Sequence, residues 1–355
     1  MIRLKFSIRK IMFSALIFIA FIISLWLRGF KQIRGADTTT YITMFEPLIS
    51  TSIPYLKYYL IMFSGTNSHG FGALNILISI ITKNQYLYLF IVTFLIILLL
   101  FYSFSVFFKD KEKKLYILSI VFILSSSTFY FYSINIIRQG LMISFFILTL
   151  YFFITNSKKK FYISFFFGIS FHISIFLIIP TLIIYKYVPR VKTPIAYIIP
   201  AFFISLVFQP IFFSKLFYAL NLPNIGEKFE FYSASTLSNL NVLIKITIIF
   251  IILSLLHAIY RYSNDFLFTE LYYITCLIFT SGMIFFNMSG LLNRFLLFIS
   301  ILLPILFCRA IYAFRRKTEY FLIGILLTSL YFTLILNHPS VKENLKIQNI
   351  KYDRH

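Results

Sequence analysis

The chain of 355 residues is 60% hydrophobic, has only 12% charged residues and carries a formal net charge of +22. Soluble globular domains have roughly 25% charged residues, so this composition excludes a soluble enzyme and predicts an integral membrane protein. The Lys and Arg residues lie in short clusters between apolar runs, which is the positive-inside pattern and argues against a nucleic-acid partner. Both cysteines, Cys276 and Cys308, lie inside apolar runs and indicate neither a disulfide framework nor a metal cluster.

Apolar runs of about 18 to 23 residues recur along the chain, and each is long enough to cross a bilayer core about 30 Å thick. We therefore expect an all-α, polytopic membrane protein with about 10 to 11 transmembrane or re-entrant helices. One membrane domain is expected over residues 1–340, followed by a polar tail over 341–355. The expected external segments are 28–84, 133–139, 214–240 and 287–294.

The first predicted span is the apolar run IMFSALIFIAFIISLWL, which follows a basic N-terminus. Because no small-residue cleavage site comes after it, we expect this span to be retained and to enter from the cytoplasm. The mixed external segment that follows contains HGFGALNILISIITK, which is amphipathic and too short to cross a membrane. In the same external segment, Asp37 directly precedes the sequence TTTYITMF. We expect Asp37 to cap a helix that carries Tyr41 and Phe45 on one side.

The next three predicted spans fix the side of Arg138. The run from Tyr86 to Phe108 ends at KDKEKK, a strong cytoplasmic marker, and the run from Leu115 to about Tyr132 returns outward. A third run, from Gly140 to Ile154, comes back to the basic cluster KKK. The positive-inside bias therefore places Arg138 outside, at the entrance of the third of these spans.

The stretch 161–186 has basic residues on both sides, so we expect it to enter the membrane and return as two short or broken helices. A single span would put every later basic cluster outside the cell. The remaining runs are expected at about 193–213, 241–260, 266–286, 295–314 and 319–337. This topology leaves the C-terminal tail outside and does not explain the basic residues of that tail.

Several polar residues share the predicted outer side. Basic residues on the translocated side work against the orientation bias, so several of them together indicate an anionic ligand. For any single arginine, the alternative is interfacial snorkelling to a lipid phosphate. The residues on this side are Arg28, Arg34, Asp37, Arg138, His172 and Arg294.

Arg138 has neighbours that snorkelling does not require. Asn135, Arg138 and Gln139 share one face if the helix starts by Asn135, and Gly140 allows close approach of a backbone or ligand. A planar guanidinium with amide donors beside it suits phosphate oxygens. His172 lies in the middle of an apolar segment, where an ionisable residue is a functional candidate, although a lone core histidine is often structural.

Several of these segments together resemble the EpsG family of bacterial exopolysaccharide proteins, relatives of the Wzy-type O-antigen and capsule polymerases. They are RGADTTTYITMFEP, FGALNILISIITKNQYLYLF, NIIRQGL, KKKFYISFFFGISFHIS and LLNRF, in order over about residues 28–300. The resemblance implies a polymerase in the bacterial cytoplasmic membrane that joins repeat units carried on undecaprenyl pyrophosphate at the outer face. Its partners would be these lipid-linked oligosaccharides, membrane lipids and other polysaccharide-assembly proteins.

The implied reaction assigns roles to the outer residues. Negative charge grows on the departing pyrophosphate, so a fixed external arginine would stabilise the leaving group. Arg138 is the first choice for this role, with Gln139 and Asn135 beside it, and Arg34 and Arg294 are second choices. His172 or Asp37 would accept the proton of the acceptor hydroxyl as general base. The sequence shows no external pair of metal-binding carboxylates, and we expect a transfer without metal or other cofactor.

Three alternatives remain at this point. A transporter or flippase of lipid-linked oligosaccharide also needs a cationic cavity, but such folds commonly have two related halves, and no second copy of IRQG is visible. A non-catalytic assembly factor would use its arginines to bind anionic lipid. A membrane-embedded glycosyltransferase with an acidic first external loop would use Asp37 and Glu46 with a metal.

Overall fold

The computed structural model describes residues 8–28, 37–50, 53–66, 68–207, 215, 218–219 and 240–313, and every regular element in this part of the chain is a helix. Five of the described helices are long and apolar enough to cross a membrane, or six if one bent pair is a single span. The predicted all-α, polytopic membrane fold is confirmed. The side of the N-terminus and the single-domain organisation stay predictions. Contacts divide the described chain into two compact units after Ile175.

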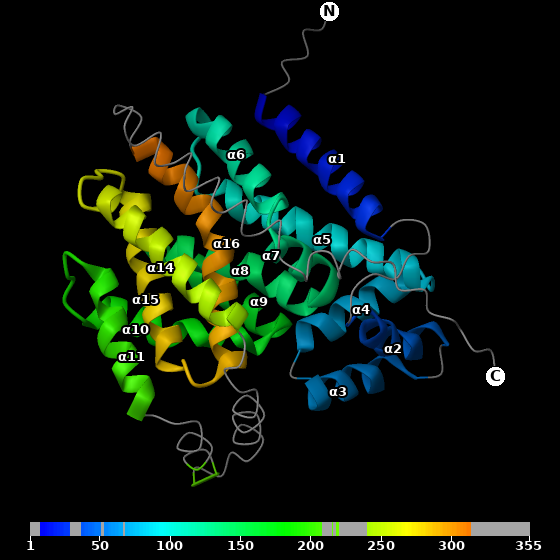
Figure 1. The fold of residues 1–355 in the computed structure, drawn as a ribbon. Coiled ribbons are helices and arrows are strands. Elements are labelled where there is room, and N and C mark those ends of the chain that lie inside the picture. Colours follow the sequence, from blue (N-terminus) through cyan, green and yellow to red (C-terminus); the bar gives the residue numbers. More distant parts are fainter. Residues whose placement is uncertain are drawn as a thin grey trace, which may run out of the picture. The chain divides into compact units, whose positions relative to one another are not determined.

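Unit 1 is built around α5 (Gln85–Ser105), which packs against α1 (Ile8–Arg28) and α8 (Ile137–Ile154). Asn84 starts α5, because its side-chain oxygen accepts hydrogen bonds from the first free backbone amides of the helix. On its other side α8 packs against α9 (Lys158–Phe171). Figure 1 shows α5 in cyan. The helices α5 and α9 thus hold α8 between them, and Arg138 lies at the start of α8.

The predicted external segment contains three short helices, α2 (Thr38–Ile49), α3 (Tyr55–Thr66) and α4 (His69–Ile81), which pack against one another (Figure 1). At 13 residues, α4 is about 20 Å long, so the prediction that it is too short to cross a membrane is confirmed. Tyr41 and Phe45 of α2 are both buried, so the prediction that they share one side of the helix is confirmed.

A buried chain of polar groups fixes these short helices to α5. The Asn75 amide of α4 donates to the Tyr58 hydroxyl of α3 at 2.9 Å and accepts from the Tyr88 hydroxyl of α5 at 3.1 Å. Phe45 stacks on Tyr88 with 4.1 Å between ring centroids. The segment is therefore a packed platform on α5.

The run predicted from Leu115 to about Tyr132 is broken in the structure and is either one broken span or a re-entrant loop. The structure has α6 (Lys113–Leu124), then α7 (Ser127–Tyr130) and a π-helical turn, Phe131–Asn135, with a bend of 76° between the two parts. The break coincides with a run of serines. The Ser126 hydroxyl accepts a hydrogen bond from the Phe129 amide, and serine side chains compete in this way with helical backbone bonds.

The predicted break within 161–186 is confirmed. The helix α9 ends at Phe171, and His172 has an extended backbone, with φ −162° and ψ 129°. A short 3-10 segment, Ile173–Ile178, and α10 (Ile179–Tyr187) follow. Whether the second part returns to the side on which the first began stays a prediction.

Unit 2 is centred on α15 (Phe266–Ile284), whose residues are buried along almost its whole length. Asp265 begins α15, since its side chain accepts a hydrogen bond from the Leu267 amide at 3.1 Å. Near the other end, a Cβ added to Gly282 would lie 2.8 Å from Phe295 Cβ, so the glycine allows the next helix to approach. The helices packed around α15 are α10, α11 (Ile198–Val207), α14 (Leu240–Tyr260) and α16 (Ser289–Ala313).

Candidate functional site

Arg138 is the second residue of α8, and the residue before this helix, Ile136, is irregular, with φ −104° and ψ 60°. Its Nη1 donates a hydrogen bond to Ser68 Oγ over 3.2 Å, and its guanidinium carbon lies 5.9 Å from the centre of the Tyr41 ring. Its Nε is buried and makes no hydrogen bond with any residue that the structure describes. Arg138 therefore faces α2 and α4 of unit 1 with donor capacity to spare, which is not the geometry of a snorkelling side chain.

Three helix ends meet beside Arg138. Ser68 is the N-cap residue of α4, but its hydroxyl makes no capping hydrogen bond and instead accepts from Arg138. A Cβ added to Gly70 would lie 2.3 Å from Ser170 Oγ, so α4 lies tightly against the end of α9. The starts of α4 and α8 and the end of α9 consequently form one polar region in unit 1.

Gln139 and His172 are brought together in this region. Gln139 Nε2 lies 3.4 Å from His172 Nε2, and His172 Nδ1 accepts a hydrogen bond from the Ser174 amide over 3.0 Å. Because Nδ1 accepts, a neutral imidazole carries its proton on Nε2, and it pairs with Gln139 when the amide oxygen and nitrogen of Gln139 are exchanged, so that the oxygen faces Nε2. His172 therefore links the end of α9 to Gln139 of α8.

Asp37 lies at the predicted N-cap position of α2, but its carboxylate makes no capping hydrogen bond, so the predicted cap is wrong. Its backbone, with φ −89° and ψ 0°, is outside the extended region that capping residues adopt. The carboxylate is exposed. One turn later, burial raises the pKa of Tyr41, and the neighbouring Arg138 guanidinium opposes this shift.

Asn135 does not share a helical face with Arg138 and Gln139, so this prediction is wrong. It is the last residue of the π-helical turn, and the irregular Ile136 separates it from α8. The prediction for Gly140 is confirmed, because a Cβ there would lie 2.4 Å from the carbonyl oxygen of Tyr132. The glycine thus allows the preceding turn to pack against α8.

Arg28 has a structural role instead of an exposed one. It is 2% exposed, and its Nε donates to Thr93 Oγ1 at 3.0 Å, its Nη1 to Thr38 Oγ1 at 3.1 Å and its Nη2 to the Ile134 carbonyl at 2.7 Å. These acceptors belong to α5, α2 and the π-helical turn before α8. Arg28 therefore ties α2, which carries Tyr41, to α5 and to the turn that precedes α8, and these donors are used by the protein.

The two remaining predicted cations lie elsewhere. Arg34 is outside the described residues. Arg294 is in unit 2, and it lies within α16, because that helix begins at Ser289 and the predicted external loop 287–294 is shorter than expected. The convergence of Arg294 with Arg138 stays a prediction.

Unit 2 contains polar residues that the sequence reasoning missed. Lys245 on α14 donates to Asn293 Oδ1 on α16 over 3.4 Å. The detectable signal was a lone lysine inside the apolar run NVLIKITIIF, since an ionisable residue in such a run is a functional candidate.

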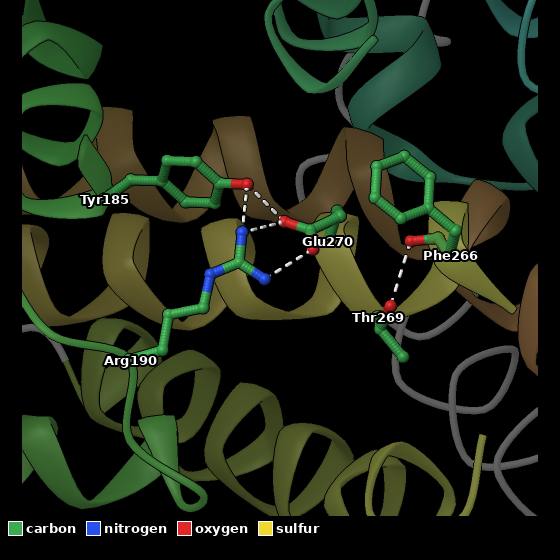
Figure 2. Close-up of polar contacts among 5 residues, drawn as sticks. All are labelled: Tyr185, Arg190, Phe266, Thr269 and Glu270. Carbon is green, nitrogen blue, oxygen red and sulfur yellow. Dashed lines mark hydrogen bonds and ion pairs between the residues drawn. The ribbon is translucent and has the colours of Figure 1, made fainter. Parts of the chain in front are cut away.

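Two ion pairs of unit 2 were also missed. Arg190 Nη1 lies 2.6 Å from Glu270 Oε1, and the Tyr185 hydroxyl donates to the same carboxylate (Figure 2). Glu270 raises the pKa of Arg190 by accepting its hydrogen bonds. Arg309 Nη2 lies 2.6 Å from Asp265 Oδ1, with both side chains buried. These pairs join α15 to its neighbours.

Comparison with known proteins identifies one family. The model of the EpsG family matches residues 14–353, which is nearly the whole chain. No curated protein and no solved structure gives a significant match.

Proposed function

The chain belongs to the EpsG family, and we propose that it is a polysaccharide polymerase of the bacterial cytoplasmic membrane. It transfers a glycan from undecaprenyl pyrophosphate to a sugar hydroxyl of another lipid-linked repeat unit at the outer face. Family membership supports the polymerase activity in exopolysaccharide synthesis. The substrate and mechanism rest on the chemistry of the residues around Arg138.

The single observation that carries the mechanism is the environment of Arg138. Its guanidinium is partly buried, donates to a neutral hydroxyl and has a buried Nε that no described residue accepts from. Among the described residues it forms no ion pair with a carboxylate. A fixed, uncompensated guanidinium of this kind is suited to two hydrogen bonds with a pyrophosphate, whose oxygens gain charge as the glycosidic bond to the carrier breaks.

The start of α4 adds to this site. Because the Ser68 hydroxyl does not cap its own helix, the first amides of α4 keep the positive end of the helix dipole beside Arg138. Helix N-termini bind phosphate groups for this reason. Arg34 is a further cation of this proposal, and Arg294 binds a pyrophosphate within unit 2.

The transfer also needs a proton acceptor. The acceptor hydroxyl oxygen bonds to the anomeric carbon, its proton passes to a base, and undecaprenyl pyrophosphate leaves with the bonding electrons. The Nδ1 lone pair of His172 is used by the Ser174 amide, whereas the carboxylate of Asp37 is exposed and makes no capping bond. We therefore assign the base to Asp37, and His172 positions Gln139. Positive charge comes from arginine in this mechanism, without a metal.

The test supplies lipid-linked repeat units on the outer face of vesicles that contain the full-length protein. The wild type is expected to lengthen them, and Arg138→Ala is expected to remain in the membrane without lengthening them. Movement of the units across the bilayer without lengthening would establish a flippase instead. Arg138→Lys tests a third function, that of a non-catalytic assembly factor. An assembly factor that needs only the positive charge would keep its activity in this variant, whereas a polymerase that relies on a forked phosphate contact would lose activity.

A further inference from the structure

The basic side chains near the two ends of α16 have different partners. Near its carboxyl end, Arg309 is paired with Asp265 at 2.6 Å, and Arg190 is paired with Glu270 of the same neighbouring helix, α15. Asp265 caps the start of α15, and Glu270 lies in its second turn. At this end of unit 2, negative charge from the protein itself therefore lies against each of these arginines.

At the amino end of α16, Lys245 meets a neutral partner. Its ammonium donates only to the Asn293 amide oxygen, at 3.4 Å, and within the part of the chain that the structure describes it has no ion pair. Lys245 belongs to an apolar span, 242–260, with a mean hydropathy of 2.6. A cation in such a span is costly unless a counter-charge is near, so an anion from outside the protein would stabilise it.

The geometry at this end leaves donors for such an anion. Lys245 and Asn293 lie about 8 Å and 6 Å along their helices from the amino ends of α14 and α16. With Asn293 Oδ1 accepting from Lys245, the amide nitrogen of Asn293 and two ammonium hydrogens of Lys245 face away from that bond. Arg294 follows Asn293 directly in the chain.

We infer that Lys245, Asn293 and Arg294 form a second anion site, which binds the phosphate headgroup of the lipid-linked acceptor. This inference rests on the proposed function. A polymerase that joins two lipid-linked units must hold two pyrophosphates at once, and the Arg138 site takes the one on the donor. Each site lies within its own unit. The acceptor pyrophosphate stays intact, so its site needs charge and donors but no base.

Binding of inorganic pyrophosphate to the full-length protein in phosphatidylcholine nanodiscs tests the number of sites by calorimetry. The wild type is expected to bind two equivalents, and Lys245→Gln and Arg138→Ala to bind one each. Lys245→Arg keeps the positive charge and is expected to keep both. Lys192→Gln, which removes an exposed lysine of the loop before α11, is the matched control and is expected to bind two. Two equivalents with Lys245→Gln, at unchanged melting temperature, would overturn the inference.

The source of the phosphate is tested by adding phosphatidylglycerol to the nanodiscs. The Lys245-dependent equivalent is expected to persist, because the site is specific for the pyrophosphate of the acceptor. Its disappearance would identify bulk anionic lipid as the occupant and overturn the acceptor assignment. In the vesicle assay, Lys245→Gln is expected to raise the KM for acceptor about tenfold with kcat little changed. Failure of the wild type to polymerise would instead refute the proposed function.

Discussion

The arginines of the two units are held in different ways. In unit 2, Arg190 and Arg309 each lie 2.6 Å from a carboxylate of α15 or its cap, so their charge is compensated by the protein. In unit 1, Arg138 has a serine hydroxyl and the face of Tyr41 as its partners. A compensated cation links helices. A cation with neutral partners keeps its positive potential for a ligand, which separates the structural arginines from the candidate catalytic one.

The largest effect is expected for Asp265→Ala, which tests the structural role of the unit 2 ion pairs. This substitution leaves Arg309 buried without its carboxylate partner. Loss of one partner of a buried pair costs about 3–5 kcal/mol, and loss of the α15 cap adds about 1 kcal/mol. We expect a large fall in melting temperature in detergent. Asp265→Asn keeps a capping oxygen and removes the charge, so it separates the two contributions. An unchanged melting temperature for Asp265→Ala would show that the pair is not structural.

The matching change in unit 1 is Arg138→Ala. It removes no ion pair among the described residues, so we expect little change in melting temperature. Its expected effect is on kcat, which should fall by about 10²–10³ as for the loss of other donors to a developing anion. Arg138→Lys keeps the charge but not the fork, and it should recover only part of the rate. Equal loss of stability and rate in Arg138→Ala would contradict the distinction between the two units.

The helices that cross the membrane were predictable from the sequence because hydropathy is a local property. The runs predicted from Tyr86, 241 and 266 begin within one residue of α5, α14 and α15. Helix irregularities were harder. The serines that break the helix after α6 also occur inside helices, and α16 starts six residues earlier than predicted because its first turns are polar.

The candidate site was predicted only in part, for a related reason. Arg138, Gln139 and His172 were found from their residue types in apolar surroundings. Their partners depend on tertiary packing, since Ser68 is 70 residues from Arg138 and His172 is 33 from Gln139. The burial of Arg28 has the same cause, because its acceptors come from helices that no local pattern brings together.

Thr93→Val sharpens the comparison within unit 1, between buried Arg28 and partly exposed Arg138. Thr93 accepts from Arg28 Nε and donates to the Ser133 carbonyl, and the proposed mechanism assigns it no contact with substrate. Removing an acceptor of a charged group costs about 1.5–3 kcal/mol, so the melting temperature should fall. Polymer synthesis per folded molecule should stay near the wild-type level. A large drop in kcat with no loss of stability would show that Arg28 acts in the reaction rather than in the fold.

The smallest effect is expected for His172→Gln, which is compared with Asp37→Asn to decide which of the two residues is the general base. His172→Gln keeps a side-chain donor near Gln139, so we expect kcat to fall by about tenfold or less, with the fall in rate at low pH unchanged. Asp37→Asn cannot accept the proton, and we expect it to lose most activity and the acid limb with it. The reason is the base role, because a carboxylate must be ionised to accept a proton. A pH profile that loses its acid limb in His172→Gln but keeps it in Asp37→Asn would make the imidazole the base, and would require the Ser174 amide to release Nδ1.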